Sequence, residues 1–335
     1  MSAPSNLCWV ADSPVGPLEI TINRAKPEKD PRDIARAACE EAGRAEAGDC
    51  VLCWSRDADG RIACAGADGG AVRTVLLSDE EWAWWFSPYG YFPEHLIVSA
   101  PVHRPMLIDH AVIARLLDFV DAFPQWFIGS NADLPIVGGS LLAHDHFQGG
   151  GYRFPLMNAP VERVFKLPGL PQVRAGVVRW TASVVRLRAR DRAAVYEGAC
   201  RVLDAWRTFS WQPGGIVPFT EDADGATVRH STLNPILWRE GGDYVMDLVL
   251  RNNRTTPEHP FGLFHVPEAL FHIKKENIGL IEIMGRAILP GRLVAEMPAV
   301  KGECERAYYE ILQATGVFKS NETGRAGWDA LIATL

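Results

Sequence analysis

The chain has 335 residues, which is enough to bury a sizeable core as one large domain or two smaller ones. Its apolar fraction of 47% and its charged fraction of 22% are ordinary for a globular protein. The net charge of −7 argues against a general nucleic-acid-binding protein, which would usually be basic, although a local basic pocket can still hold a small anionic substrate.

The N-terminal residues 1–6 (MSAPSN) have neither the basic segment nor the long apolar segment of a signal peptide. No apolar run in the chain approaches the length of a membrane span. Seven cysteines, an odd number, favour a reducing compartment over a disulfide scaffold. We therefore expect a cytoplasmic protein without a membrane segment.

The first predicted helix begins at Asp30-Pro31 and ends near Ala47, and a C-x-x-C pair, Cys50 and Cys53, follows it. Such a pair fits zinc or redox chemistry, while buried cysteines are also common in ordinary cores. The redox interpretation would need a thioredoxin-like context, which the surrounding sequence lacks. A zinc site would need two more ligands from elsewhere in the chain.

The next segments predict a strand, a helix and a second strand. After a Gly-, Ala- and Asp-rich stretch at 57–70, which predicts a loop, the apolar residues 96–98 predict a buried strand. Asp109 is a candidate N-cap for a helix that ends near Phe123, because residues 113, 116, 117 and 120 share one face. Residues 126–128 predict another short strand.

Residues 131–151 carry the strongest functional pattern. His144, His146 and Gln148 alternate along a predicted strand, so their side chains would share one face. Gly138, Gly139 and Ser140 precede them and can form a turn whose backbone N–H groups bind an anion. An imidazole beside a phosphate-binding turn suits phosphoryl or nucleotidyl transfer through a phosphohistidine.

The second half predicts a similar series of elements. A Pro-rich segment at 155–171 connects the halves, and residues 184–188 predict a half-buried strand. A helix from Asp191 to about Phe209 follows, then a hairpin of strands 233–239 and 244–251, then helices at about 303–318 and 328–335. We infer a weak internal duplication with halves at 1–160 and 161–335.

Three blocks of this sequence resemble the galactose-1-phosphate (hexose-1-phosphate) uridylyltransferases of the histidine-triad superfamily, and most closely their bacterial second type. They are Gly-Gly-Ser with His-Asp-His-Phe-Gln in residues 138–148, residues 247–255 (DLVLRNNRT), and residues 271–293 (FHIKKENIGLIEIMGRAILPGRL). The similarity extends from about Cys50 to about Leu293. The chain is shorter than we expect for this type, and most of the missing length lies before Cys50.

The resemblance implies an α+β, histidine-triad-like (HIT-like) fold, in which two pseudo-repeated halves have mostly antiparallel sheets flanked by helices. It implies an enzyme that exchanges UMP between a UDP-hexose and a hexose 1-phosphate in galactose metabolism, with His146 as the covalent nucleophile. Its partners would be these two small molecules. Members of the family are commonly dimers, so a homodimer is also implied.

The same resemblance assigns residues to each part of the site. It implies a structural zinc held by Cys50, Cys53, His103 and His144, a closed tetrahedral set. Asn131, Gly139 and Ser140 match positions near the nucleotide and phosphates, and Arg251 and Arg254, at a strand end, are further candidates for phosphate or uracil contact. The predicted hexose-phosphate residues are Lys274, Lys275, Glu276, Asn277 and Glu282. Without the resemblance, Lys274 and Lys275 would suggest a solvated charge pair and Glu282 a surface carboxylate.

Gln148 favours a transferase over a hydrolase. In hydrolytic histidine-triad proteins a third histidine stands at this position and can protonate a poor leaving group, whereas an amide can only hydrogen-bond. A phosphate leaving group needs little acid assistance. Two alternatives stay open: a GDP-hexose phosphorylase with the same nucleophile, and a non-catalytic sugar-nucleotide-binding protein. Neither the base nor the preferred hexose follows from the sequence.

Overall fold

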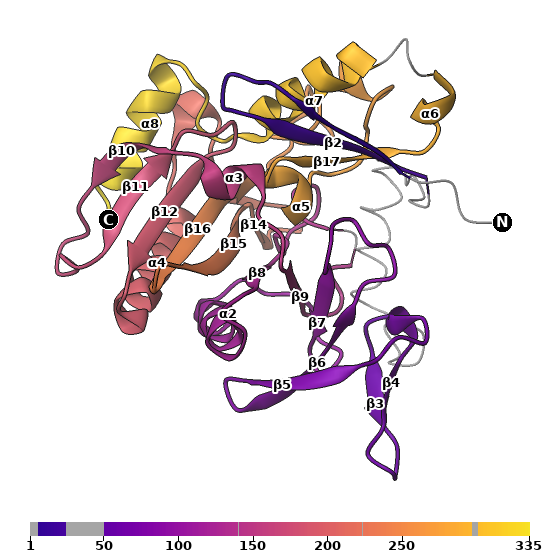
Figure 1. The fold of residues 1–335 in the computed structure, drawn as a ribbon. Coiled ribbons are helices and arrows are strands. Elements are labelled where there is room, and N and C mark those ends of the chain that lie inside the picture. The colour runs from indigo at the N-terminus through magenta and orange to yellow at the C-terminus, as the bar shows by residue number, and fades with distance from the viewer. Residues whose placement is uncertain (1–5, 25–49, 140, 223, 297–300) are drawn as a thin grey trace.

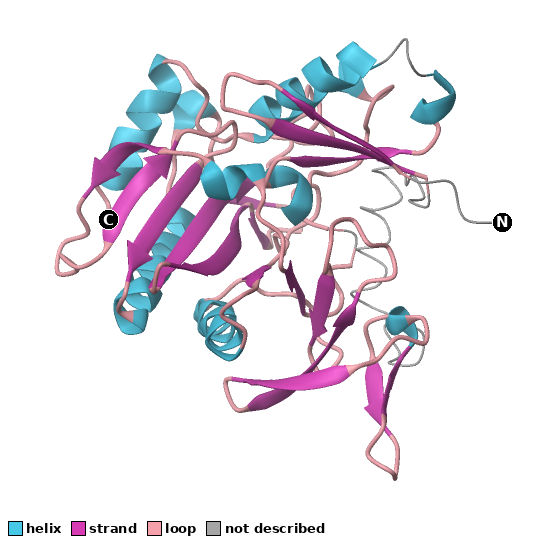
Figure 2. Cartoon of the chain, viewed as in Figure 1, coloured by secondary structure: helices cyan, strands magenta, loops and turns pink. Residues whose placement is uncertain are grey.

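The computed structural model describes residues 6–24, 50–139, 141–222, 224–296 and 301–335. The predicted helix at 30–47 and the candidate residue Ser140 lie outside these ranges. Most of the described strands belong to one long antiparallel sheet, with helices packed on its faces (Figure 1, Figure 2). Among the described residues, no helix combines the length and the apolar character needed to cross a membrane.

The main sheet has ten strands in the order β10-β11-β12-β16-β15-β8-β9-β7-β6-β5, and every neighbouring pair is antiparallel. The strands from the first half of the chain are β5 (Arg73–Leu77), β6 (Glu80–Phe86), β7 (Leu96–Ser99), β8 (Phe127–Gly129) and β9 (His146–Gly150). Those from the second half are β10 (Val161–Phe165), β11 (Arg174–Val178), β12 (Val184–Ala189), β15 (Ser231–Glu240) and β16 (Asp243–Asn252).

The two halves of this sheet have the same topology. Each half has three strands, a helix and two more strands in chain order, and in each half the last strand lies beside the third. The halves join where β8 pairs with β15, between Ile128 and Leu237 and between Gly129 and Ile236. The strand order thus repeats along the sheet, while the division of the chain into halves at 1–160 and 161–335 stays a prediction.

Helices α2 (His110–Ala122) and α4 (Arg192–Thr208) are the equivalent helices of the two halves, and they pack on the same face of the sheet. The carboxylates of Asp109 and Asp191 cap them by accepting hydrogen bonds from the first-turn N–H groups. The predicted apolar residues of α2 at 113, 116, 117 and 120 are all buried. Their core includes Leu96, Val98 and Phe147 of strands β7 and β9.

A second core covers the opposite face of the second half. It includes residues of α3 (Pro155–Asn158), α5 (Leu280–Ile283) and α7 (Lys301–Thr315), and of a small sheet in the order β1-β2-β17. That sheet consists of β1 (Leu7–Ala11), β2 (Leu18–Asn23) and β17 (Arg286–Pro290), and β17 runs parallel to β2. The remaining helices of the C-terminal part of the chain are α6 (Leu293–Glu296) and α8 (Glu322–Ile332).

Two predicted loops contain regular structure. The stretch 57–70 includes most of a hairpin between β3 (Trp54–Arg56) and β4 (Ile62–Cys64), which is seen below β6 in Figure 1. The Pro-rich segment 155–171 contains α3 and the edge strand β10, because its prolines lie outside the paired part of that strand. Short elements elsewhere are the hairpin β13 (Phe219–Glu221) and β14 (Thr227–Arg229), and 3₁₀ turns at Ala65–Ala67, Gln212–Gly214 and Glu268–Leu270.

Candidate active site and metal centre

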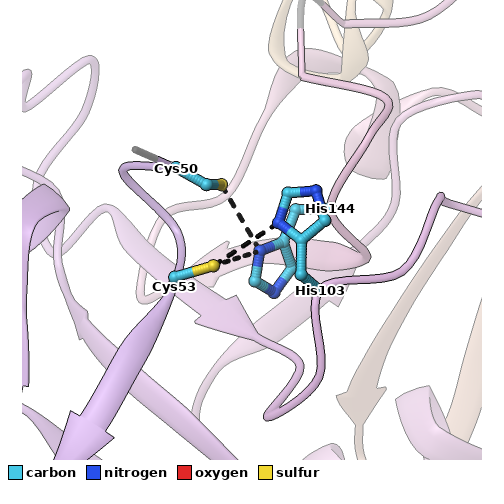
Figure 3. Close-up of side chains that lie close together, drawn as sticks. All are labelled: Cys50, Cys53, His103 and His144. Atoms are coloured by element: carbon cyan, nitrogen blue, oxygen red, sulfur yellow. Dashed lines mark hydrogen bonds between the residues drawn. The ribbon is translucent and has the colours of Figure 1, made fainter. Parts of the chain in front are cut away.

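The four predicted metal ligands lie together although they come from three separate segments. Cys50 and Cys53 lie in the turn before β3, and His103 follows β7. His144 lies two residues before β9, so it is outside the strand that was predicted to carry it together with His146 and Gln148. The potential ligand atoms of the four ligand residues all lie within 4.8 Å of one another. Figure 3 shows both sulfur atoms directed at the two imidazole rings.

The distances in this group fit a tetrahedral metal ion. Cys50 Sγ lies 3.4 Å from His144 Nδ1, and Cys53 Sγ lies 3.4 Å from His103 Nδ1 and 3.6 Å from His144 Nδ1. Tetrahedral zinc, with Zn–S of about 2.3 Å and Zn–N of about 2.0–2.1 Å, separates sulfur from nitrogen by about 3.5 Å. The group is therefore a Cys2His2 set that could bind a metal.

His144 is oriented by its second ring nitrogen. Its Nε2–H donates to the carbonyl oxygen of Ala100 at 3.0 Å and lies 3.2 Å from Ser99 Oγ, which itself donates to Leu52 O at 2.8 Å. This tautomer leaves the Nδ1 lone pair facing the two sulfur atoms. Burial lowers the pKa of His144 to about 4, which keeps the ring neutral. The equivalent nitrogen of His103, Nε2, is buried and has no hydrogen-bond partner among the residues that the structure describes.

His146, the predicted nucleophile, is the first residue of β9 and pairs with Ser99 of β7. Its Nδ1–H donates to the carbonyl oxygen of His144 at 2.8 Å, which fixes the tautomer of the ring. The Nε2 atom then carries the lone pair. Burial lowers the pKa of His146, so the imidazole is neutral. Its side chain lies on the face of β9 opposite Phe147 and helix α2.

Gln148 shares this face with His146 and is half-buried. Its Oε1 atom lies 3.0 Å from Nε2 of His95, the residue just before β7. The sequence analysis did not select His95. One signal could have identified His95 as a neighbour of Gln148. It lies two residues before Ile97, and Ile97 pairs with Gln148 on the adjacent strand.

The predicted phosphate-binding turn packs tightly against Asn131. A Cβ atom on Gly139 would lie 2.7 Å from Asn131 Nδ2, and one on Gly138 would lie 2.2 Å from the carbonyl oxygen of Ala132. Asn131 Oδ1 accepts a hydrogen bond from the backbone N–H of Leu280 at 2.8 Å. The glycines are therefore required by close packing within the protein, and Asn131 links the turn to the start of α5.

Arg251 and Arg254 donate to acceptors within the protein, while the Nε atom of Arg251 is buried without a partner among the described residues. Arg251 is almost fully buried and donates to Asn234 Oδ1 at 2.8 Å and to the carbonyl oxygen of Ile278 at 3.1 Å. Burial lowers the pKa of Arg251 to about 10. Arg254 Nη1 donates to the carbonyl oxygen of Gly215 at 3.0 Å. Both contacts hold loops of the second half in place.

The predicted hexose-phosphate residues form a largely buried charged cluster. Lys274 is 1% exposed, and its Nζ atom lies 2.7 Å from Glu282 Oε1 and 3.4 Å from Glu276 Oε2. The expectation of a solvated lysine and a surface carboxylate, drawn from residue types alone, is therefore wrong for Lys274 and Glu282. Their burial together is stabilised because each charge has an opposite partner. Asn277 Oδ1 lies 3.1 Å from His265 Nε2, and Lys275 is half-buried.

Tyr91 connects the charged cluster to the strand face of His146 and Gln148. Burial and the nearby carboxylates of Glu282 and Glu276 raise the pKa of Tyr91 to about 12. The ring of Tyr91 also stacks on His95 with the centroids 5.5 Å apart. The candidate residues of the two halves are thus neighbours in space. A separate cleft of about 940 Å³, lined by α4, α8 and Trp211, contains none of them.

Comparisons with known proteins identify the family of this chain. Residues 119–313 match the family model of the galactose-1-phosphate uridyl transferase C-terminal domain. The chain is 41% identical to a galactose-1-phosphate uridylyltransferase of Halalkalibacterium halodurans, over 98% of this chain and 72% of that protein. The enzyme of the same name from Bacillus subtilis is 46% identical, over 87% of this chain and 56% of that protein. The one from Caldanaerobacter subterraneus is 44% identical, over 88% of this chain and 57% of that protein. The chain thus spans little more than half the length of the last two.

Among solved structures, a uridylyltransferase mutant matches 78% of this chain and 98% of its own at 11% identity, with a TM-score of 0.31. A DUF4931 family protein from Bacillus cereus matches 55% of this chain and 87% of its own at 14% identity, with a TM-score of 0.37. TM-scores this low do not establish a shared fold.

Proposed function

The chain belongs to the galactose-1-phosphate uridylyltransferase family, and we propose that it exchanges UMP between UDP-glucose and galactose 1-phosphate through a uridylyl-histidine. The observation that carries this proposal is the state of His146. Its Nδ1–H is held by the His144 carbonyl and burial keeps the ring neutral, so Nε2 carries a lone pair for attack.

The reaction consists of two displacements at the same phosphorus atom. In the first, the Nε2 lone pair forms a bond to the α-phosphorus of UDP-glucose while the bond to the bridging oxygen breaks, and glucose 1-phosphate leaves. In the second, a phosphate oxygen of galactose 1-phosphate attacks the α-phosphorus, and the P–N bond breaks to release UDP-galactose. The Nδ1–H stays hydrogen-bonded to His144 O in both steps, where it stabilises positive charge on the ring.

Gln148 fits this exchange because neither leaving group needs a proton donor. The leaving group is a sugar phosphate in the first step and the histidine ring in the second. The amide N–H of Gln148 can donate to an α-phosphoryl oxygen, on which negative charge is concentrated during each displacement. We assign the anion-binding role to Gly138, Gly139, Ser140 and Asn131, and we assign Arg251 and Arg254 to supporting loops, because protein carbonyls already accept from them.

The hexose phosphate would bind at Lys274, Lys275, Glu276, Asn277 and Glu282. A buried ammonium attracts phosphate, and carboxylates accept hydrogen bonds from sugar hydroxyls. Lys274 is already paired with Glu282 at 2.7 Å, so phosphate binding here means that the ammonium exchanges one anionic partner for another. The Glu282 carboxylate that Lys274 releases would then accept hydrogen bonds from sugar hydroxyls.

The Cys2His2 group would bind zinc as a structural ion. Cysteine and histidine are preferred zinc ligands, and four protein ligands leave no open position for substrate. The ion would hold His144, whose carbonyl oxygen orients His146. In the same way we assign a HIT-like fold to each half, 1–160 and 161–335, on the repeated topology of the sheet. We also propose a homodimer in the cytoplasm, as the family resemblance implies.

Substrate access requires movement at His146. The residue is 5% exposed in the single chain, so neighbouring side chains must shift before an α-phosphorus can approach Nε2. Closure around the bound substrate would then exclude water, which competes with the second sugar phosphate for the uridylyl group.

Intact-protein mass spectrometry tests the proposed function. Wild-type protein incubated with UDP-glucose should gain the mass of one uridylyl group, and galactose 1-phosphate should remove it with formation of UDP-galactose. His146→Ala should gain nothing while keeping its thermal melting temperature. A guanylyl adduct from GDP-glucose that inorganic phosphate removes would instead indicate a GDP-hexose phosphorylase. No adduct with either nucleotide would indicate a binding protein and overturn the proposal.

A further inference from the structure

His95 is a buried histidine that belongs to neither the proposed metal set nor the predicted substrate residues. It is 3% exposed and directly precedes β7. Its Nε2 atom lies 3.0 Å from Gln148 Oε1, within hydrogen-bonding distance. This contact joins the only side-chain amide on the described part of β9 to an imidazole from a neighbouring strand.

The register of the sheet produces this contact. Ile97 of β7 pairs with Gln148 of β9, and His95 lies two residues before Ile97 on the same face. His95 and Gln148 are therefore diagonal neighbours on antiparallel strands, a separation that long side chains can bridge. His146 lies on this face as well, two residues before Gln148.

The protonation of His95 determines which end of the Gln148 amide is held. Burial lowers the pKa of His95 to about 4, so at neutral pH the ring carries a single proton. Its Nδ1 atom is buried without a hydrogen-bond partner within the described ranges of the chain. A buried unpaired N–H costs more than a buried unpaired lone pair, so the proton belongs on Nε2. Nε2–H then donates to Gln148 Oε1.

The ring of His95 is itself held in place. It stacks on the ring of Tyr91 with the ring centroids 5.5 Å apart, and its centroid lies 4.6 Å from that of the Phe92 ring. The carbonyl oxygen of Tyr91 accepts a hydrogen bond from Arg286 Nε at 2.9 Å, and Arg286 pairs with Glu19 at 2.6 Å. The imidazole therefore presents a fixed donor to Gln148.

We propose that His95 is a positioning residue that holds the Gln148 carbonyl oxygen and so turns the amide NH₂ toward the α-phosphoryl oxygens at His146. This inference rests on the proposed function. An amide without this restraint can rotate by half a turn about its terminal bond and direct its oxygen at the negatively charged phosphate, where it would repel. His95 itself touches neither the substrate nor the reacting atoms.

The test compares variants that remove or keep the donor. His95→Phe keeps a stacking ring and His95→Met keeps an apolar side chain, and both lack the donor. His95→Gln has a side-chain N–H at a similar reach from the backbone. Tyr244→Phe is the matched control, because it removes a hydrogen bond of a buried side chain, from Tyr244 Oη to Asp121 Oδ1, far along the sheet. The measurement is the single-turnover rate of uridylylation by UDP-glucose, with a thermal melt of each variant.

The donor-free variants should uridylylate about tenfold more slowly than wild type, the order expected for one neutral hydrogen bond. His95→Gln should recover most of the rate, and Tyr244→Phe should keep it. In a Gln148→Ala background, His95→Phe and His95→Met should cause no further loss, because His95 acts only through Gln148. A purely structural His95 would slow both backgrounds equally.

The two levels of the proposal fail in different ways. If wild-type protein forms no uridylyl adduct, the proposed function is overturned. If wild type forms the adduct but both donor-free variants keep its rate, or lose the same factor with and without Gln148, the role of His95 is overturned.

Discussion

Removing one ligand of the Cys2His2 group should lower the global stability of the protein by a predictable amount. Cys53→Ser is the sharpest change, because Cys53 Sγ contacts both imidazole rings, at 3.4 and 3.6 Å. A serine hydroxyl is a poor zinc ligand, and three remaining ligands bind the ion far more weakly. The change would therefore remove the proposed zinc cross-link between distant segments of the chain.

The magnitude follows from the length of chain that the ion closes. A bridge between Cys50 and His144 links residues 94 positions apart. Treated as a cross-link that restricts the unfolded chain, a loop of this length contributes about 4.7 kcal/mol to the free energy of unfolding at 25 °C. With an unfolding entropy of the size expected for 335 residues, the melting temperature should fall by about 7 °C.

Elemental analysis and scanning calorimetry check this prediction together. Wild-type protein should contain zinc, and Cys53→Ser should lose it and melt at the lower temperature. Cys64→Ser is the matched control: its thiol donates to the Val51 carbonyl oxygen at 3.3 Å in the same hairpin and is not a member of the ligand set. It should keep both the metal and the melting temperature. A metal-free wild type, or equal melting of wild type and Cys53→Ser, would refute the structural role.

Three further predictions concern stability and activity elsewhere. Asp247→Ala should lose about 3–5 kcal/mol of unfolding free energy in urea, because it leaves the buried guanidinium of Arg186 without its bidentate partner; wild-type stability would contradict this. His95 has a pKa of about 4 when folded and about 6.5 when unfolded, so the unfolded state binds the proton first and stability falls as pH drops from 6.5 to 4. The His95→Gln variant should lack this part of the decline in melting temperature. If melting temperature falls with pH in parallel for the two proteins, His95 does not contribute to the decline. Gly139→Ala should slow uridylylation severalfold and lower the melting temperature, because its Cβ would lie 2.7 Å from Asn131 Nδ2 and displace a side chain whose Oδ1 accepts a buried hydrogen bond from Leu280; an unchanged rate would show that Asn131 does not act in the site.

The parts of the fold that local pattern predicts are those with strong periodicity. Helix α2 was predicted from its N-cap at Asp109 and its apolar face, and β15 and β16 from their alternation around Gly241-Gly242. In each case residues within one element carry the signal, because burial of one face imposes a period of 3.6 or 2. The local C-x-x-C spacing identified Cys50 and Cys53 as candidate ligands, whereas His103 and His144 were predicted as ligands only through the family resemblance, because they lie in distant segments.

The features that sequence reasoning missed depend on contacts between distant segments. The burial of Lys274 and Glu282 follows from their mutual ion pair, whereas a lysine or glutamate considered alone is expected at the surface. The contact between His95 and Gln148 depends on the register of β7 against β9, which no local pattern specifies. Strand β10 is predicted poorly because a two-residue step near Val161 interrupts its register and three of its five residues are exposed.

The two halves of the sheet use one equivalent face differently, and only the first half carries the predicted His-x-His-x-Gln pattern there. Strands β7 and β9 of the first half correspond to β12 and β16 of the second, and the faces opposite α2 and α4 are equivalent. In the first half that face presents His146 and Gln148. In the second half it presents Arg186 paired with Asp247, and the same guanidinium donates to carbonyl oxygens of Leu156 and Ala159 at the ends of α3.

These two uses of one face exclude each other. In the second half the guanidinium of Arg186 donates to Asp247 and to the carbonyl oxygens of α3. A guanidinium has no lone pair that could act as a nucleophile or base. In the first half the same face carries His146 and Gln148, and His146 is 5% exposed, so an anionic ligand would reach it only after neighbouring side chains shift. Substitutions at Asp247 should therefore change stability before activity, and substitutions at Gln148 should change activity before stability.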